Sequence, residues 1–225
     1  MAKLGIRLFG AFQAYANDQL LASFRTLKTQ ALLIYLVTEP PGPHRREALM
    51  TLLWPDLPPE PAQVNLRQIV YQLRHTIPDA DGRHSNEKVP FVVTDRYTIS
   101  INPDAAFEAD VRRFSRLTHA VQSHKHSHIL TCDACHEHLM EATSIYRDPF
   151  LADFYLKDSN EFEEWAQRYR ERYRRQQIDA LATLAQMALN QSQYSAAQTY
   201  AQQQLAIDNL DERAYRQLME GLARN

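Results

Sequence analysis

The sequence predicts an α+β domain over residues 1–104, followed by an all-α domain over residues 105–225. In the first hundred residues, short apolar runs bounded by turn residues alternate with amphipathic segments. From Glu108 onward the composition shifts to helix-forming residues, and the apolar residues recur at helical spacing. A chain of 225 residues is long enough for two cores of this kind.

The first domain is predicted to begin with two strands, residues 6–12 and 20–24, joined through the turn residues Asn17 and Asp18. Three amphipathic helices, the first two of them ended by proline-rich segments, follow at 26–37, 45–54 and 61–77. Alternating patterns on either side of Asp95-Arg96-Tyr97 predict a closing hairpin over 91–94 and 98–101. Strands, three helices and a hairpin in this order are the parts of a winged helix-turn-helix domain.

The third predicted helix has the composition of a helix that reads DNA. Such a helix buries one side and offers hydrogen-bond donors on the other, without carboxylates that would repel phosphate. No acidic residue lies between Ala62 and Ile77. The predicted inner face consists of Val64, Leu66, Ile69, Val70, Leu73 and Ile77, and the predicted outer face of Gln63, Asn65, Arg67, Gln68, Tyr71, Gln72, Arg74 and His75. Since Arg can pair with guanine and Asn or Gln with adenine, we expect double-stranded DNA as the ligand; a solvated helix face is the alternative.

Several motifs follow one another in a specific order along the chain. They are Ile6-Arg7-Leu8-Phe9-Gly10, Lys28 through Leu36, Arg46-Glu47-Ala48-Leu49, Leu53-Trp54-Pro55-Asp56, Asn65-Leu66-Arg67, Leu73-Arg74, Tyr146-Arg147-Asp148-Pro149-Phe150-Leu151 and Glu161-Phe162-Glu163-Glu164-Trp165. With these motifs the chain resembles the AfsR/DnrI/RedD-type (SARP) bacterial regulators, which join an OmpR-type winged helix to a bacterial transcriptional activation domain. The resemblance covers nearly the whole chain.

The resemblance implies a transcriptional activator that binds DNA in a sequence-specific manner. It implies major-groove contacts for four residues of the third helix, Arg67, Tyr71, Gln72 and Arg74. It implies backbone or minor-groove contacts for Thr94 and Arg96 of the hairpin. The remaining candidate DNA contacts are Gln68, His75 and Lys28. The resemblance also implies a dimer on direct repeats and a helical domain that contacts RNA polymerase or a regulatory module.

The second domain is predicted to contain long helices over 161–189 and 194–207, and a further helix that opens at Asp211. Large and small residues approximate the pattern of a tetratricopeptide helix pair: Leu184, Ala185, Ala188, Tyr194, Ala197, Ala201 and Leu205. One such pair cannot bury its own apolar face, so neighbouring helices must cover it. By comparison with the family, we expect the chain to be part of a longer regulator that completes these helices.

A segment rich in histidine and cysteine interrupts the helical pattern between residues 119 and 138. It offers Cys132, Cys135, His126 and His128 as candidate ligands for a structural zinc ion, which prefers thiolate and imidazole donors. Alternatively, the two cysteines pack as small apolar residues at the start of a helix over 135–146. An arginine-rich run at 168–175 could contact DNA or a protein, but a solvated helix face is the simpler interpretation.

Charge and composition narrow the other classes of function. The first 104 residues carry eleven Lys and Arg against ten Asp and Glu, so DNA binding requires a local basic face. This near-neutral balance leaves open a helical adaptor whose winged helix binds protein instead. The chain holds only five glycines and shows no phosphate-binding loop or nucleophile-base pattern, so no enzyme is predicted. Without an apolar run of about eighteen residues, we expect a cytoplasmic protein with no membrane partner.

Overall fold

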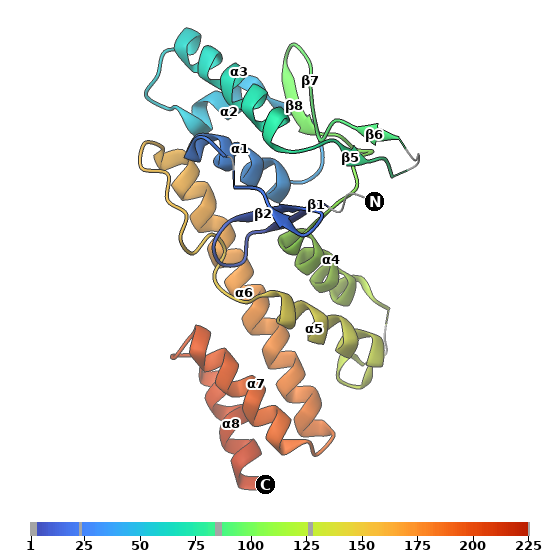
Figure 1. The fold of residues 1–225 in the computed structure, drawn as a ribbon. Coiled ribbons are helices and arrows are strands. Elements are labelled where there is room, and N and C mark those ends of the chain that lie inside the picture. The colour runs from blue at the N-terminus through green and yellow to red at the C-terminus, as the bar shows by residue number, and fades with distance from the viewer. Residues whose placement is uncertain (1–3, 23, 84–86, 126–127, 225) are drawn as a thin grey trace. The chain divides into compact units, whose positions relative to one another are not determined.

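The computed structural model describes residues 4–22, 24–83, 87–125 and 128–224 (Figure 1). The chain forms two compact units, one of Met1–Arg112 with Phe150–Arg168 and one of Arg113–Pro149 with Tyr169–Asn225. The units therefore do not follow a single boundary after residue 104. The first unit extends beyond residue 104 because the strand Phe107–Ala109 joins its N-terminal sheet and because the segment 150–168 packs within it.

The N-terminal sheet has four strands in the order β3-β2-β1-β9: β1 (Leu4–Arg7), β2 (Gln13–Ala16), β3 (Gln19–Leu20) and β9 (Phe107–Ala109). β1 pairs antiparallel with β2 and parallel with β9. The Asn17-Asp18 turn is confirmed, since both residues have positive φ, 51° and 62°, and connect β2 to β3. The strand predicted over 6–12 is right only for Ile6 and Arg7, where β1 ends, because the chain turns at Gly10, where φ is 95°.

Three helices form the centre of the first unit: α1 (Leu27–Thr38), α2 (Arg46–Leu53) and α3 (Pro59–Thr76). Each begins and ends within two residues of its predicted bounds. The Thr26 side chain caps α1 by accepting from the Thr29 N–H. The helices pack through side chains that are fully buried, among them Leu32, Leu33, Leu49, Leu53, Leu66 and Leu73.

A second sheet carries the predicted hairpin, β7 (Val92–Thr94) and β8 (Thr98–Ile101), and β8 also pairs with β4 (His44–Arg45) just before α2. Between α3 and this hairpin lie two short strands for which no element was predicted, β5 (Ala80–Asp81) and β6 (Lys88–Val89). The three helices with this hairpin form the predicted winged helix-turn-helix, so the fold class of the first domain is confirmed.

The segment 150–168 belongs to the core of the first unit. Its backbone binds the N-terminal loop, where the Leu151 N–H donates to the Leu8 carbonyl over 2.9 Å. Trp165 is 3% exposed, packs against the rings of Tyr35 and Phe150, and donates from Nε1 to Glu39 Oε1 over 2.7 Å. The residues buried with it are Leu151, Phe154, Leu156, Phe162 and Ala166. This apolar density is why the segment packs into the core of the winged-helix unit.

All regular secondary structure among the described residues of the second unit is helical. Its elements are α4 (Asp110–Ser123), the 3₁₀ turn η1 (Ile129–Thr131), α5 (Asp133–Ile145), α6 (Asn160–Asn190), α7 (Tyr194–Ile207) and α8 (Glu212–Arg224), with the start of α4 and of α6 in the first unit. The predicted helix pair is confirmed in α6 and α7, since Leu184, Ala185, Ala188, Ala197 and Ala201 are buried. Among the described residues, no helix has the length and hydropathy of a membrane span.

Buried polar side chains fix how α6, α7 and α8 pack. The Gln204 side chain of α7 donates to Gln217 Oε1 of α8 over 3.1 Å, and Gln217 donates to the Ala182 carbonyl of α6 over 2.9 Å. A partly exposed ion pair from the arginine-rich run also links α6 to the end of α7, because Arg174 pairs with Asp208 over 3.0 Å as well as with Glu171. These ion pairs raise the pKa of Arg174 and indicate a structural role for this part of the run.

Candidate nucleic-acid interface

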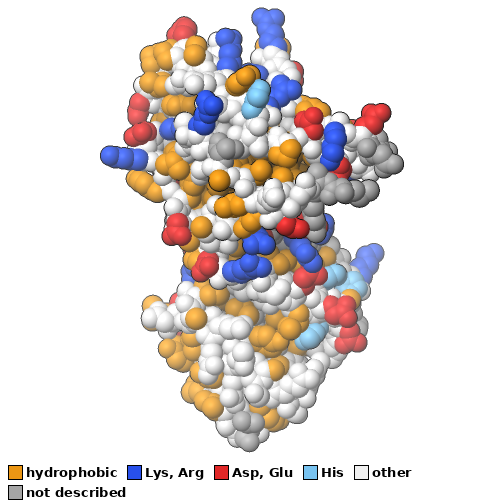
Figure 2. All heavy atoms as spheres, viewed as in Figure 1, with side chains coloured by type: hydrophobic (Ala, Val, Ile, Leu, Met, Phe, Trp, Pro, Cys, Tyr) orange, Lys and Arg blue, Asp and Glu red, His pale blue; other side chains and the backbone are white. Residues whose placement is uncertain are grey.

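The exposed face of α3 carries most of the predicted DNA contacts. Arg67, Gln68, Tyr71, Arg74 and His75 are exposed, whereas Ala62, Leu66, Ile69, Val70 and Leu73 are buried below them. Lys and Arg side chains are visible around α3 and the tip of the β7–β8 hairpin (Figure 2). The helix begins two residues earlier than predicted, and its first turn includes Glu60. The part of α3 that follows Glu60 contains no acidic residue.

The prediction that Val64 faces the core is wrong, because its side chain is 59% exposed on the same helix. Further along, Tyr71 is 63% exposed and its ring lies 4.0 Å from that of His75, centroid to centroid. The His75 Nδ1 lies 2.8 Å from the Tyr71 carbonyl oxygen. The apolar side chain of Val64 and a tilted pair of aromatic rings therefore accompany the arginines on this face.

Gln72 does not share this face. Its Oε1 accepts a hydrogen bond from Thr29 Oγ1 over 2.9 Å, and Thr29 is fully buried in α1. The side chain thus ties α3 to α1 inside the unit. This geometry argues against the major-groove contact predicted for Gln72, and we do not keep it among the DNA contacts.

Lys28 is also occupied within the fold. Its ammonium donates to the carbonyl of Leu53 and, over 3.2 Å, to the carbonyl of Asp158, and it lies 5.8 Å from the centroid of the Trp54 ring. Burial lowers the pKa of Lys28, an effect that the nearby Asp158 carboxylate opposes. Lys28 thus links the start of α1 to the end of α2 and to Asp158. This geometry argues against its predicted role as a DNA contact.

The tip of the hairpin is held in shape by Asp95. Its Oδ1 accepts from the N–H groups of Tyr97 and Thr98 over 2.6 and 2.7 Å, and its Oδ2 accepts from the Thr98 hydroxyl over 2.7 Å. The Thr98 hydroxyl bond and these backbone bonds keep the pKa of Asp95 below its usual value. The carboxylate is consequently engaged in the turn, and the neighbouring Arg96 is exposed, with its guanidinium 5.4 Å from the Tyr97 ring centroid.

Thr94 occupies a different position from Arg96. It is half-buried in β7 and pairs with Ile99 of β8. Its backbone is therefore engaged in the sheet, and at most part of its side chain is available to a ligand.

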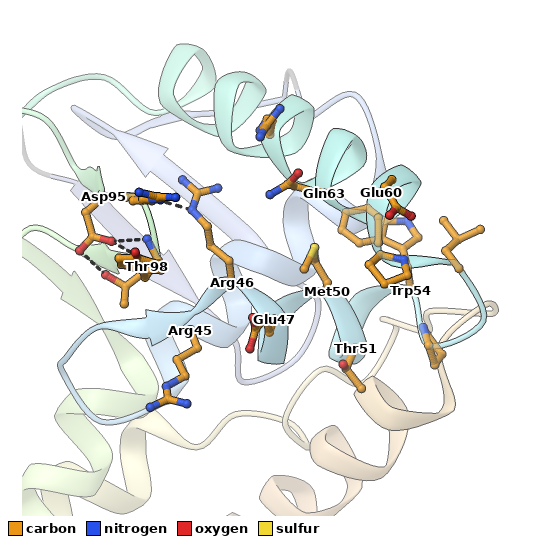
Figure 3. A pocket seen from close by; sticks show the side chains of 17 residues that line it. Arg45, Arg46, Glu47, Met50, Thr51, Trp54, Glu60, Gln63, Asp95 and Thr98 are labelled. Carbon is orange, nitrogen blue, oxygen red and sulfur yellow. Dashed lines mark hydrogen bonds between the residues drawn. The ribbon is translucent and has the colours of Figure 1, made fainter.

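An open groove of about 1140 Å³ lies between α2, the first half of α3 and the hairpin (Figure 3). Arg46 extends into it between the hairpin and α3, and its Nε donates to the Asp95 carbonyl over 3.1 Å. Its backbone N–H donates to the Tyr97 carbonyl over 2.9 Å. Arg67 and Arg96 line the same groove, together with Gln63.

Arg46 is a candidate contact that the sequence analysis missed. Its only signal was a pair of adjacent arginines, Arg45 and Arg46, at the start of a predicted helix. Of the acids that line the groove, Asp95 is engaged in the hairpin turn, whereas Glu47 and Glu60 are exposed. Arginines from α2, α3 and the hairpin thus converge on one groove from three separate elements.

The structure changes the candidate metal ligands. His124 Nδ1 lies 3.2 Å from Cys135 Sγ and 3.4 Å from Cys132 Sγ, so His124 joins the two cysteines. His128 is exposed at the start of η1 and is not part of this group, and His126 lies outside the described residues. The cysteines form no disulfide, and burial, with the neighbouring Cys132, raises the pKa of Cys135 to about 11.

Comparison with known proteins gives the family. Residues 109–225, more than half of the chain, match the model of the bacterial transcriptional activator domain. The structure "Mycobacterium tuberculosis EmbR in complex with low affinity phosphopeptide" is similar over 100% of this chain and 55% of that one, with a TM-score of 0.70 and 22% sequence identity. This chain thus spans about half the length of that protein, and at this identity the likeness concerns the fold. No curated protein sequence matches. The family resemblance seen in the sequence is confirmed, and the chain belongs to the bacterial transcriptional activator domain family.

Proposed function

We propose that this chain is a sequence-specific DNA-binding transcriptional activator in which α3 enters the major groove and the β7–β8 hairpin meets the adjacent groove. The observation that carries the proposal is the face of α3 beyond Glu60. It is exposed, free of acids and rich in donors, and it is continuous with a groove lined by arginines. A major groove about 12 Å wide admits one α-helix, and its base edges are read by such donors.

The proposal divides the contacts into two kinds. Arg67 and Arg74 lie seven residues apart on α3, or two helical turns, so both reach the same side of the helix. We assign base reading to them, with Gln68 beside them. Tyr71 lies between the two arginines on the helix, and His75 directly follows Arg74. Both side chains fit contacts to sugar or to a thymine methyl group.

Arg96 and Arg46 are assigned to the phosphate backbone. Arg96 is at the tip of a turn fixed by Asp95, and Arg46 is anchored to that turn through its Nε and its backbone N–H. Preorganised guanidinium groups of this kind bind phosphate oxygens through paired donors. Because they contact no base, they add affinity that is independent of sequence.

The second unit is proposed to act on transcription by contacting RNA polymerase or a regulatory module of a longer protein, as membership of the activator-domain family suggests. We further propose action in the cytoplasm and, by the family resemblance, a dimer on direct repeats. The rival is an adaptor whose winged helix binds protein, which the near-neutral charge of residues 1–104 and the exposed Val64 and Tyr71 would suit.

The test begins with selection of bound sites from a random duplex library, using the 225-residue chain. The affinity for a selected duplex is then measured over a range of salt concentrations. We expect the logarithm of the affinity to fall linearly with the logarithm of the salt concentration, by about 0.9 for each phosphate contact. Failure to enrich any sequence, together with no salt-dependent binding to duplex DNA, would refute the proposal and favour the adaptor.

A further inference from the structure

We propose that His124, Cys132 and Cys135 form a zinc-binding site in the second unit, which is separate from the DNA-binding function proposed above. One donor atom from each residue, the imidazole nitrogen and the two sulfurs, lies within 4.8 Å of the others. The His124 Nδ1 is 3.2 Å from one sulfur and 3.4 Å from the other. Three donors that converge in this way leave a position for one ion among them.

The distances agree with a tetrahedral zinc site. Zinc binds sulfur at about 2.3 Å and imidazole nitrogen at about 2.0–2.1 Å, so ligands at a tetrahedral angle are separated by about 3.6 Å for a nitrogen and a sulfur. The two nitrogen-sulfur distances are shorter than this by only a few tenths of an ångström. Two sulfurs and one imidazole are soft and borderline donors, which select zinc over magnesium or calcium.

The local fold explains why these three residues meet. Cys132 is the N-cap of α5, and Cys135 follows one turn later on the same end of the helix. Both sulfurs therefore lie at the N-terminal end of α5, and binding of a zinc ion would displace their protons. His124 directly follows α4, where its N–H continues the helix by donating to the Ala120 carbonyl over 2.9 Å.

The surroundings of the site indicate a structural role. Cys135 is fully buried in an apolar cluster with Val121, Leu139, Leu184 and Met187. Ile129 and Leu130, in the connection between α4 and α5, pack against the same cluster. An ion held by His124 and the two cysteines would fasten the end of α4 to the start of α5, as structural zinc sites do. The fourth position is left for water or a further ligand.

The experiment uses the 225-residue chain kept under a reducing agent that does not bind metal. We expect about one zinc ion per chain by elemental analysis. After replacement by cobalt, we expect the thiolate-to-metal charge-transfer absorption and the visible bands of a tetrahedral site. Absence of both bound zinc and the cobalt spectrum would overturn the proposal.

Two variants identify the ligands. His124→Ala and Cys132→Ser should each abolish stoichiometric binding and the tetrahedral cobalt bands. The matched control is His136→Ala, on the same helix as Cys135 but outside the cluster, and it should bind as the unaltered chain does. Circular dichroism of each variant verifies that it is folded. Full cobalt binding by a folded His124→Ala chain would overturn the assignment of this ligand set. Because the readout is metal content, a failure of DNA binding would not affect it.

Discussion

Truncation of Trp165 is expected to destabilise the winged-helix unit, although this residue lies more than fifty residues beyond the last strand of that unit. Its indole is 3% exposed and packs against Tyr35, Phe150 and Phe162, with ring centroids 5.1–6.1 Å away. Large-to-small changes of a buried tryptophan cost about 3–5 kcal/mol, since they remove apolar burial and leave a cavity. For Trp165→Ala we therefore expect a loss of about 4 kcal/mol.

A second variant separates packing from hydrogen bonding. Trp165→Phe keeps most of the ring contacts but removes the Nε1 donor of the 2.7 Å bond to Glu39. A hydrogen bond of this kind contributes about 1–2 kcal/mol, and Glu39 is only half-buried, so water can replace the donor. We expect Trp165→Phe to cost about 1 kcal/mol.

The assay is urea unfolding followed by tryptophan fluorescence. The chain contains two tryptophans, so in both variants Trp54 is the remaining one, and it reports on the first unit alone. Tyr155→Ala serves as the control, because Tyr155 is in the same segment but 62% exposed, and we expect a change within about 0.5 kcal/mol. An unchanged midpoint for Trp54 in the Trp165→Ala chain would refute the view that the segment 150–168 completes the winged-helix core.

Two further predictions concern side chains inside the first unit. Gln72→Ala should lower the free energy of unfolding by about 1 kcal/mol, because it removes the acceptor for the Thr29 hydroxyl. The ratio of affinities for a selected and a scrambled duplex should stay unchanged. A reduced ratio would show that Gln72 contacts a base. Burial raises the pKa of the Asp110 carboxyl, although the N–H groups of Phe9, Leu8 and Val111 that bind it act in the opposite direction. A carboxyl whose pKa is raised in the folded state stabilises that state most at low pH, and this contribution is lost as the pH rises through the folded pKa. Relative to Asp110→Asn, the unaltered chain should therefore lose stability as the pH rises above about 4, the pKa of an unperturbed aspartate. A difference between the two chains that is constant with pH in urea unfolding would contradict this.

The helices and the hairpin could be predicted from the sequence because their signals are local. Apolar spacing and proline stops give α1, α2 and α3 within two residues, and the alternation around Asp95 gives β7 and β8. The strand predicted over 6–12 is too long because the chain turns at Gly10 in the middle of an apolar run. Periodicity alone does not show which glycine adopts a positive φ. The small strands β5 and β6 are too short to produce a pattern.

The site could be predicted only as far as one helix face. Helical spacing places Gln72 near the edge of the outer face, but its bond to Thr29 depends on how α3 packs on α1. In the same way, Lys28 bonds to carbonyls at Leu53 and Asp158, and His124 meets the two cysteines through the return of the chain after α4. The segment 150–168 packs in the first unit through contacts with residues far away in the sequence. Its apolar composition predicts that it is buried, but not which residues cover it.

The most direct test of the account is the ratio of affinities for a selected and a scrambled duplex, measured for Arg74→Ala and Arg96→Ala together. Arg74→Ala should weaken binding to the selected duplex by about 1–3 kcal/mol and lower the ratio, because it removes a base contact. Arg96→Ala should weaken both duplexes alike, keep the ratio and make the salt slope shallower by about one. Arg7→Ala, on β1 of the N-terminal sheet, is the matched control and should leave the ratio and the slope unchanged. An unchanged ratio in Arg74→Ala, together with an unchanged slope in Arg96→Ala, would contradict the claim that α3 reads bases while the hairpin holds the backbone.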